Sequence, residues 1–142
     1  MKPRVMFPDP ERRIVDYLAS ALSSETVTVG SILPTNWGVG SVPHILVVCD
    51  GTPRERWPVA AWPTVRLVAH VAPQPGQLVG SSSEAKRLAL LAQGLLLSRP
   101  SDAEISTITG LAGLLTVSDP EHDNAALASV SVRVELRSVP IP

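Results

Sequence analysis

The sequence predicts an α+β fold, with a mostly antiparallel or mixed sheet of about five strands and two helices packed on one face. Apolar and polar side chains alternate over residues 128–137, which is typical of a strand with one buried face. Residues 10–22 and 82–97 place apolar side chains at helical spacing. The first three strand-like segments are joined without a strong helix, which favours antiparallel pairing.

Length and composition indicate one domain over residues 1–142, because a chain of this size can bury a single core. Hydrophobic residues make up 44% of the chain, with one Phe and one Tyr, so Val, Leu, Ile and Ala must build that core. The net charge of −1 gives no general electrostatic reason to bind nucleic acid or an anionic membrane. We therefore expect a soluble protein from a reducing compartment, with no membrane partner, and with the single Cys49 as a buried hydrophobe.

The first helix has a clear start. Asp9 is suited to cap the free amides, Pro10 fits the first helical position, and Glu11 complements the positive end of the helix. An apolar stripe then predicts that this helix packs on the sheet; it consists of Ile14, Val15, Leu18 and Leu22.

Three strands are predicted between the helices. Residues 26–33 read as a first strand, and the apolar run 44–49 predicts a central strand that is covered on both faces. Residues 52–63 have no clear period and contain three prolines, so we expect a loop or a loose extension there. Residues 64–72 alternate again and read as a third strand, followed by the linker 73–80.

The second helix begins at a capping box formed by Ser81 and Glu84. Leu90 and Leu97 lie off its main apolar stripe, which predicts burial on more than one face, by the sheet and by a second helix or another subunit. Gly94 is unfavourable inside a helix, and we interpret it as a mark of close backbone packing.

The last third of the chain reads as strand-like segments 105–110 and 114–119, an acidic turn at 119–124, and a final strand to Val139. The turn carries Asp119, Glu121, His122 and Asp123, whose carboxylates and imidazole are of the types that bind cations. Their spacing matches no known metal-binding loop. A solvated hairpin turn is the prediction here, and no metal.

Basic and aromatic side chains gather in the segment 52–63: Arg54, Arg56, Trp57 and Trp62. Trp and Arg are common anchors of protein interfaces, so we favour contact with a neighbouring subunit. Packing onto the chain's own core and stacking on nucleic acid stay open. In the final strand, Arg133 and Arg137 belong either to a solvated face or to an ionic contact between subunits.

No set of residues has the spacing of a known active site. The three histidines fall on different segments, and the glycine-rich stretches lack the lysine of phosphate-binding loops. We therefore expect no enzymatic activity and no cofactor.

With these elements in order, the chain resembles the tail terminator proteins of long-tailed bacteriophages, especially those that infect actinobacteria. The resemblance covers almost the whole chain. It is carried by Phe7-Pro8-Asp9-Pro10-Glu11 with its helix, the Val27-Thr28-Val29-Gly30 strand, the strand from Pro43 to Gly51, the Ser83-Glu84-Ala85 helix to Leu97, and a Thr109-Gly110 hairpin before Asp119 and the closing strand.

The resemblance implies a structural virion protein that is assembled in the host cytoplasm and sits at the head-proximal end of the tail. Copies of the α+β protomer would form a homo-oligomeric ring of about six that caps the tail tube, ends its polymerisation and offers a joining surface to the head-completion or neck protein. DNA would pass through the lumen only as cargo. On this reading the segment 54–62 and the turn 119–124 contact neighbours or the tube.

Three other readings remain at this stage. A head-completion or neck adaptor shares the small size and the ring, but it binds the portal side. A small cytoplasmic enzyme would need a pocket with converging polar groups. A regulatory binding module would show a recognition helix with surface Lys and Arg, and Lys occurs only at Lys2 and Lys86.

Overall fold

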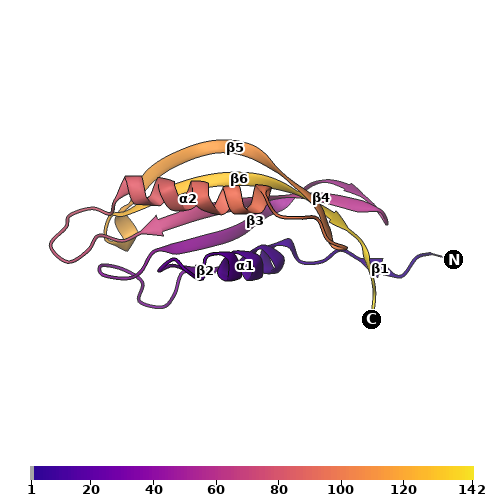
Figure 1. The fold of residues 1–142 in the computed structure, drawn as a ribbon, viewed down its shortest axis with the longest axis horizontal. Coiled ribbons are helices and arrows are strands. Elements are labelled where there is room, and N and C mark those ends of the chain that lie inside the picture. Colours follow the sequence, from indigo (N-terminus) through magenta and orange to yellow (C-terminus); the bar gives the residue numbers. More distant parts are fainter. Residues whose placement is uncertain (1) are drawn as a thin grey trace.

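A computed structural model describes residues 2–142, apart from the side chain of Ala112. Figure 1 shows a twisted sheet with both helices on one face, so the predicted α+β architecture is confirmed. The helices are α1 (Pro10–Ala21) and α2 (Ser82–Leu97). The main sheet has the order β2-β3-β4-β6-β5, with β2 (Thr28–Gly30), β3 (His44–Arg56), β4 (Ala60–Val71), β6 (Ala125–Arg137) and β5 (Ile105–Asp119). A second, small sheet pairs β1 (Val5–Met6) with β7 (Val139–Pro140) near the termini.

Strand pairing is mixed and mostly antiparallel, as predicted. β2 runs parallel to β3, and the three other pairs of the main sheet are antiparallel. The final strand has the predicted alternation: Val130, Val132 and Val134 are buried, whereas Arg133 between them is exposed. The strand ends at Arg137, two residues before the predicted end, because the chain then turns to form β7.

One face of the sheet and both helices form the main core. From α1 it receives Ile14, Leu18 and Leu22, each at most 3% exposed. α2 contributes Leu88 and Leu96 to the same cluster. Both helices start as the sequence predicts, since the side chains of their N-cap residues, Asp9 and Ser81, accept backbone N–H groups of the first turn. The opposite face of the sheet carries no helix (Figure 1) and is called the open face below.

The predicted loop at 52–63 is wrong. β3 and β4 continue as a hairpin, and only residues 57–59 form the turn. Pro53 and Pro63 misled the prediction, because both lie where the pairing of β3 with β4 is interrupted and no ladder hydrogen bond is lost. Beyond that interruption, Arg54 pairs across the strands with Trp62.

The Thr109-Gly110 hairpin is also wrong. Residues 105–110 and 114–119 belong to a single strand, β5, whose pairing with β6 is irregular between Gly110 and Leu115. The glycines at this point mark bulges and not a turn. The reversal of the chain comes later, at a short 3-10 helix, η1 (Pro120–His122), between β5 and β6.

Four smaller predictions fail as well. The first strand is only three residues long, against the predicted 26–33. In β3 only the helix-facing side is fully covered: Ile45 and Val47 are buried, whereas Leu46 and Val48 are half-buried. Cys49 is likewise half-buried and not a core residue. Gly94 does not mark close packing, because a Cβ added there meets no atom within 4 Å.

Candidate functional site

The open face carries a shallow cleft of about 220 Å³ at the end of the sheet near the β3–β4 turn. Each of the four long strands contributes to it. Arg54 comes from β3, Trp62 from β4 and Arg133 from β6, so three residues singled out in the sequence are brought together. The rest of the lining is Thr107, Thr109 and Glu135.

The cleft places cationic and aromatic side chains side by side. The Arg54 guanidinium carbon lies 4.4 Å from the centre of the Trp62 ring, so the cation stacks on the aromatic face. Across the strands, the Thr107 hydroxyl donates to the Glu135 carboxylate at 3.2 Å. Among the described residues, no ion pair engages Arg54 or Arg133, so both guanidinium groups retain donors for a partner.

The other predicted residues at this end have different surroundings. Arg56 is exposed at the end of β3. Trp57, in the turn, packs edge-on against Phe7 with ring centres 5.8 Å apart and stays 53% exposed. Arg137 donates to the Asp102 carbonyl and the Ser106 hydroxyl, so its guanidinium binds its own chain.

The acidic turn lies at the opposite end of the sheet (Figure 1). Asp119 accepts the Glu121 N–H at 3.0 Å and lies 2.6 Å from Nδ1 of His122. Burial raises the pKa of Asp119, but hydrogen bonds from His122 and the Glu121 N–H outweigh it and leave this pKa lowered. Asp123 accepts the Val39 N–H at 3.2 Å, whereas the Glu121 side chain is exposed. The turn therefore binds the loop 31–43, an internal contact that its spacing did not reveal.

Two of the three histidines, which lie far apart in the sequence, pack against one tryptophan, and the third lies opposite one of them. The Trp37 ring centre is 5.8 Å from that of His70 and 6.4 Å from that of His122, both in edge-to-face geometry. His44 lies directly opposite His70 on the neighbouring strand. Only the fold brings these residues together. His44 begins β3 and His70 lies next to the last residue of β4. The presence of a histidine at the end of each of two apolar strands was the one signal in the sequence for this pair.

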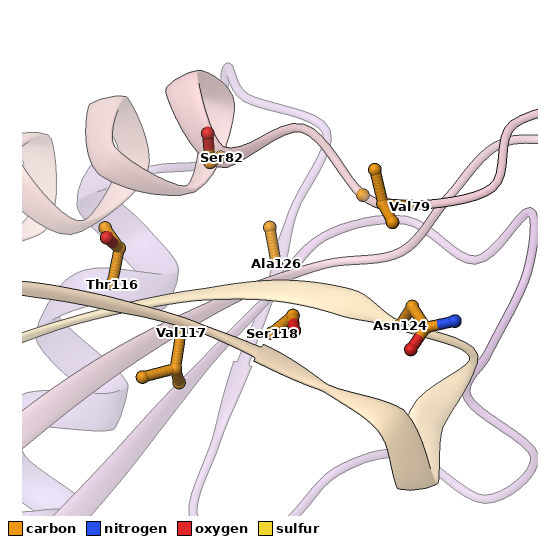
Figure 2. Close-up of a pocket in the computed structure, with 8 residues that line it drawn as sticks. Val79, Ser82, Thr116, Val117, Ser118, Asn124 and Ala126 are labelled. Carbon is orange, nitrogen blue, oxygen red and sulfur yellow. The ribbon is translucent and has the colours of Figure 1, made fainter.

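A second cavity, of about 360 Å³, lies between the start of α2 and the end of β5. In Figure 2, Thr116 points toward α2, whereas Val117 points to the other side of β5. The lining combines hydroxyl groups of Ser82 and Ser118 with the amide of Asn124. None of its lining residues is ionisable, so this cavity offers no general acid or base.

An apolar surface was missed by the sequence analysis. Along β5, four apolar side chains are exposed, and two leucines of α2 are exposed as well. Val117 points away from α2 (Figure 2), so the set borders both faces of the strand. We call this set the β5 surface: Leu111, Leu114, Leu115 and Val117 of β5, with Leu90 and Leu97 of α2. A Cβ built at Gly110 would lie 4.0 Å from Leu97, which places α2 over the same strand. Leu115 is 65% exposed and Leu90 50% exposed.

Two structural findings limit the chemistry. Within residues 2–142, no three His, Cys, Asp or Glu side chains lie where they could hold a metal ion. No helix in the same range has the length and apolar character needed to cross a membrane.

No family model matches the sequence. No curated protein matches it with significance.

Proposed function

We propose that this protein is a ring-forming tail terminator of a long-tailed bacteriophage, which caps the tail tube and ends its polymerisation. The β5 surface is the observation that carries the proposal, because clustered exposed apolar side chains mark surfaces that bind another chain. Full burial of a Leu or Val side chain is worth about 1.5–3 kcal/mol, so covering six of them contributes substantially to assembly. The predicted second burial face of α2, at Leu90 and Leu97, belongs to this surface.

The two edges of the sheet differ in a way that supports assembly through β5. The β3 edge is protected against pairing: the Glu11 side chain accepts the Cys49 N–H at 2.6 Å, Pro53 lacks an N–H, and charged residues follow at 54–56. The β5 edge has none of these devices, since residues 105–118 contain no charge and no proline. A long, uncharged and apolar edge strand is normally covered by another chain.

A closed ring needs two different surfaces on each subunit, because each copy meets its neighbours through unlike contacts. The β5 surface would supply one of them. We assign the other contacts to the residues singled out in the sequence, which would meet a neighbouring subunit, the tail tube protein or the head-completion protein. At one end of the sheet these residues are Arg54, Arg56, Trp57, Trp62, Arg133 and Arg137. At the other end they are Asp119, Glu121 and Asp123. Arg54 and Arg133 support this assignment best, since both present free donors in the open-face cleft.

The proposed role as a tail terminator also implies where the protein resides and what it does not do. The protein acts without enzymatic activity or a cofactor, and it resides in the virion at the head-proximal end of the tail after assembly in the host cytoplasm. DNA passes through the ring as cargo. The net charge of −1 is consistent with passage, because tight binding to phosphates requires a local excess of positive charge.

Tube capping is the direct test of this function. Tail tube protein would be polymerised with and without the purified protein, and tube lengths and ends examined by negative-stain electron microscopy. We expect shorter tubes with a ring at one end. Unchanged tube lengths would contradict the proposal, and immunogold labelling of virions on the portal side of the neck would instead assign the protein to head completion.

Charge reversal at Arg54 and Arg56 tests the second surface. The double variant Arg54→Glu, Arg56→Glu should lose ring formation or tail joining, because both guanidinium groups would be replaced by carboxylates. Arg12→Glu on the exposed side of α1 is the matched control and should behave as wild type. Normal rings and normal tail joining in the double variant would contradict the assignment.

A further inference from the structure

One loop covers the end of the open face beside the acidic turn. We call residues 31–43 the lid. Most of its side chains are exposed, and its one large buried side chain is Trp37, at 8% exposure. The Trp37 indole donates to the Val42 carbonyl at 2.9 Å, a bond within the lid itself. Trp37 is therefore the largest anchor of the lid on the sheet, with the half-buried Leu33 packed against the same cluster.

Beneath the lid, two histidines occupy neighbouring strands. His44 is 2% exposed and His70 is 5% exposed, and they form a directly opposed pair. The Nδ1 atom of His44 lies 2.6 Å from the Thr28 hydroxyl, but its Nε2 atom is buried without a hydrogen-bond partner. His70 donates from Nδ1 to the Val68 carbonyl at 3.1 Å. The Trp37 ring packs edge-to-face on His70.

We propose that the lid is a pH-operated latch, closed while His44 and His70 are neutral and released when both become protonated. The proposal is independent of the tail terminator function. It rests on the placement of two opposed buried imidazoles under a loop with one large anchor. Two like charges directly opposite each other on adjacent strands are destabilising, and more so where water is excluded.

Burial is the largest cause that favours the neutral state of both imidazoles. Burial lowers the pKa of His44, as does the positive charge that His70 acquires, whereas the nearby backbone of Ile32 raises it. Burial also lowers the pKa of His70; the Val68 carbonyl and the Asp119 carboxylate raise it, and His122 lowers it.

The lowered pKa values of the two histidines determine how the stability of the closed lid depends on pH. Because both pKa values are lowered in the folded protein, the closed lid has its full stability above the ordinary histidine pKa of about 6.5 and loses it as the pH falls through the lowered values.

Release of the lid would also break contacts that the lid makes with the acidic turn. Asp123 binds the Val39 N–H of the lid at 3.2 Å, and the Trp37 ring also packs against His122. Two backbone bonds also hold the lid: Gly40 N–H to the Pro73 carbonyl within it, and Thr28 N–H to the Pro43 carbonyl at its end, each 3.0 Å long. Opening would thus expose Trp37 and free the Asp123 side chain in one movement.

Accessibility of Trp37 is the measurement that tests the latch. In a Trp57→Phe, Trp62→Phe background Trp37 is the only tryptophan, because the chain has three. Acrylamide quenching of its fluorescence would be followed from about pH 8 to about pH 5, with far-UV circular dichroism recorded on the same samples. We expect quenching to rise several-fold, with a midpoint below the ordinary histidine pKa and with unchanged secondary structure.

Histidine variants then show whether His44 and His70 cause the change in quenching. His44→Asn with His70→Gln should keep Trp37 shielded over the whole range, whereas His122→Gln, at the more exposed third histidine, should retain the transition. Three results would overturn the proposal: constant quenching in the parent, an unchanged transition in the double variant, or loss of secondary structure at the same pH.

If the double variant fails to fold, nuclear magnetic resonance titration of the histidine rings in the parent decides. A native pKa of about 6.5 or higher for both His44 and His70 would likewise overturn the latch.

Discussion

At the residue scale, Gly80 and Gly94 have opposite environments. A Cβ at Gly80 would collide with the carbonyl oxygen of Val71 and would lie 2.7 Å from the backbone nitrogen of Ala126, whereas one at Gly94 points into open space. Gly94 is exposed inside α2, on the same side as Leu90 and Leu97. Only Gly80 is therefore required by packing.

The first prediction compares alanine at these two positions. Gly94→Ala should raise the free energy of unfolding by about 1 kcal/mol, because alanine has the higher helix propensity and meets no clash. Gly80→Ala should lower it by clearly more than that, since backbone atoms must move. Urea denaturation of both variants measures the difference, and an equal effect of the two substitutions would contradict the packing described.

The second prediction concerns Asp102, which stabilises the start of β5. Its carboxylate accepts the N–H groups of Ile105 and Glu104, each at 2.8 Å, and pairs with Arg99. The Ile105 N–H is the largest cause that holds the pKa of Asp102 below its usual value of 3.8. This stabilisation is present above the unfolded pKa and is lost as the pH falls through the lowered folded value.

Asp102→Ala should therefore cost up to about 1 kcal/mol at neutral pH, and the difference from wild type should vanish in acid. Denaturant unfolding at several pH values measures it. Glu121→Ala, at an exposed carboxylate of the turn, is the control and should show little effect. If Asp102→Ala still lowers the free energy of unfolding below the folded pKa of Asp102, the carboxylate charge is not what stabilises the start of β5.

At the element scale, β5 is the strand on which the proposal of assembly depends. It is fifteen residues long, lies at the edge of the sheet and pairs only with β6. Its outer edge is free in the described chain, and four of its apolar side chains face solvent. Added charge on these four side chains would test whether another chain covers them.

The third prediction places lysine on β5. Leu115→Lys with Val117→Lys should abolish assembly and leave the protomer folded, because both side chains are already exposed and only a covered surface would be disrupted. Leu78→Lys is the matched control, since Leu78 is 88% exposed in the linker before α2. Size-exclusion chromatography with circular dichroism tests both, and assembly that survives the β5 substitutions would place the contact elsewhere.

The sequence predicted those elements whose pattern is set by burial on one side. Both helices and β6 follow from apolar spacing, and the caps at Asp9 and Ser81 mark their starts. The β3–β4 hairpin beyond Gly51 was missed because its side chains project from a sheet that is not covered on both faces. There the strand is held by the backbone ladder and by the Arg54–Trp62 contact, and neither produces an apolar period.

The candidate site was predicted only in part, for a related reason. Arg54, Trp62 and Arg133 were chosen for their residue types, but their convergence depends on a β3–β4 register that a predicted loop does not have. The Trp37 cluster depends on tertiary contacts among four segments, which no local pattern encodes. The β5 surface was within reach, since the uncharged run 105–118 is visible in the sequence.

At the scale of the whole molecule, the proposed contacts occupy three separate regions. The arginine and tryptophan residues lie at one end of the sheet, the acidic turn and the lid lie at the other, and the β5 surface runs along the edge between them (Figure 1). A ring subunit needs unlike surfaces for its neighbours and further surfaces at the two faces of the ring. This arrangement supplies both kinds, and the account therefore depends on self-assembly.

The solution mass of the purified protein tests that claim most directly. Multi-angle light scattering over a range of concentrations, with negative-stain images of the same peak, would give the number of copies and the shape. The account predicts closed rings of about six copies, which the β5 lysine variant reduces to monomers. A strict monomer at the highest concentrations, both alone and with polymerised tail tube protein, would contradict it.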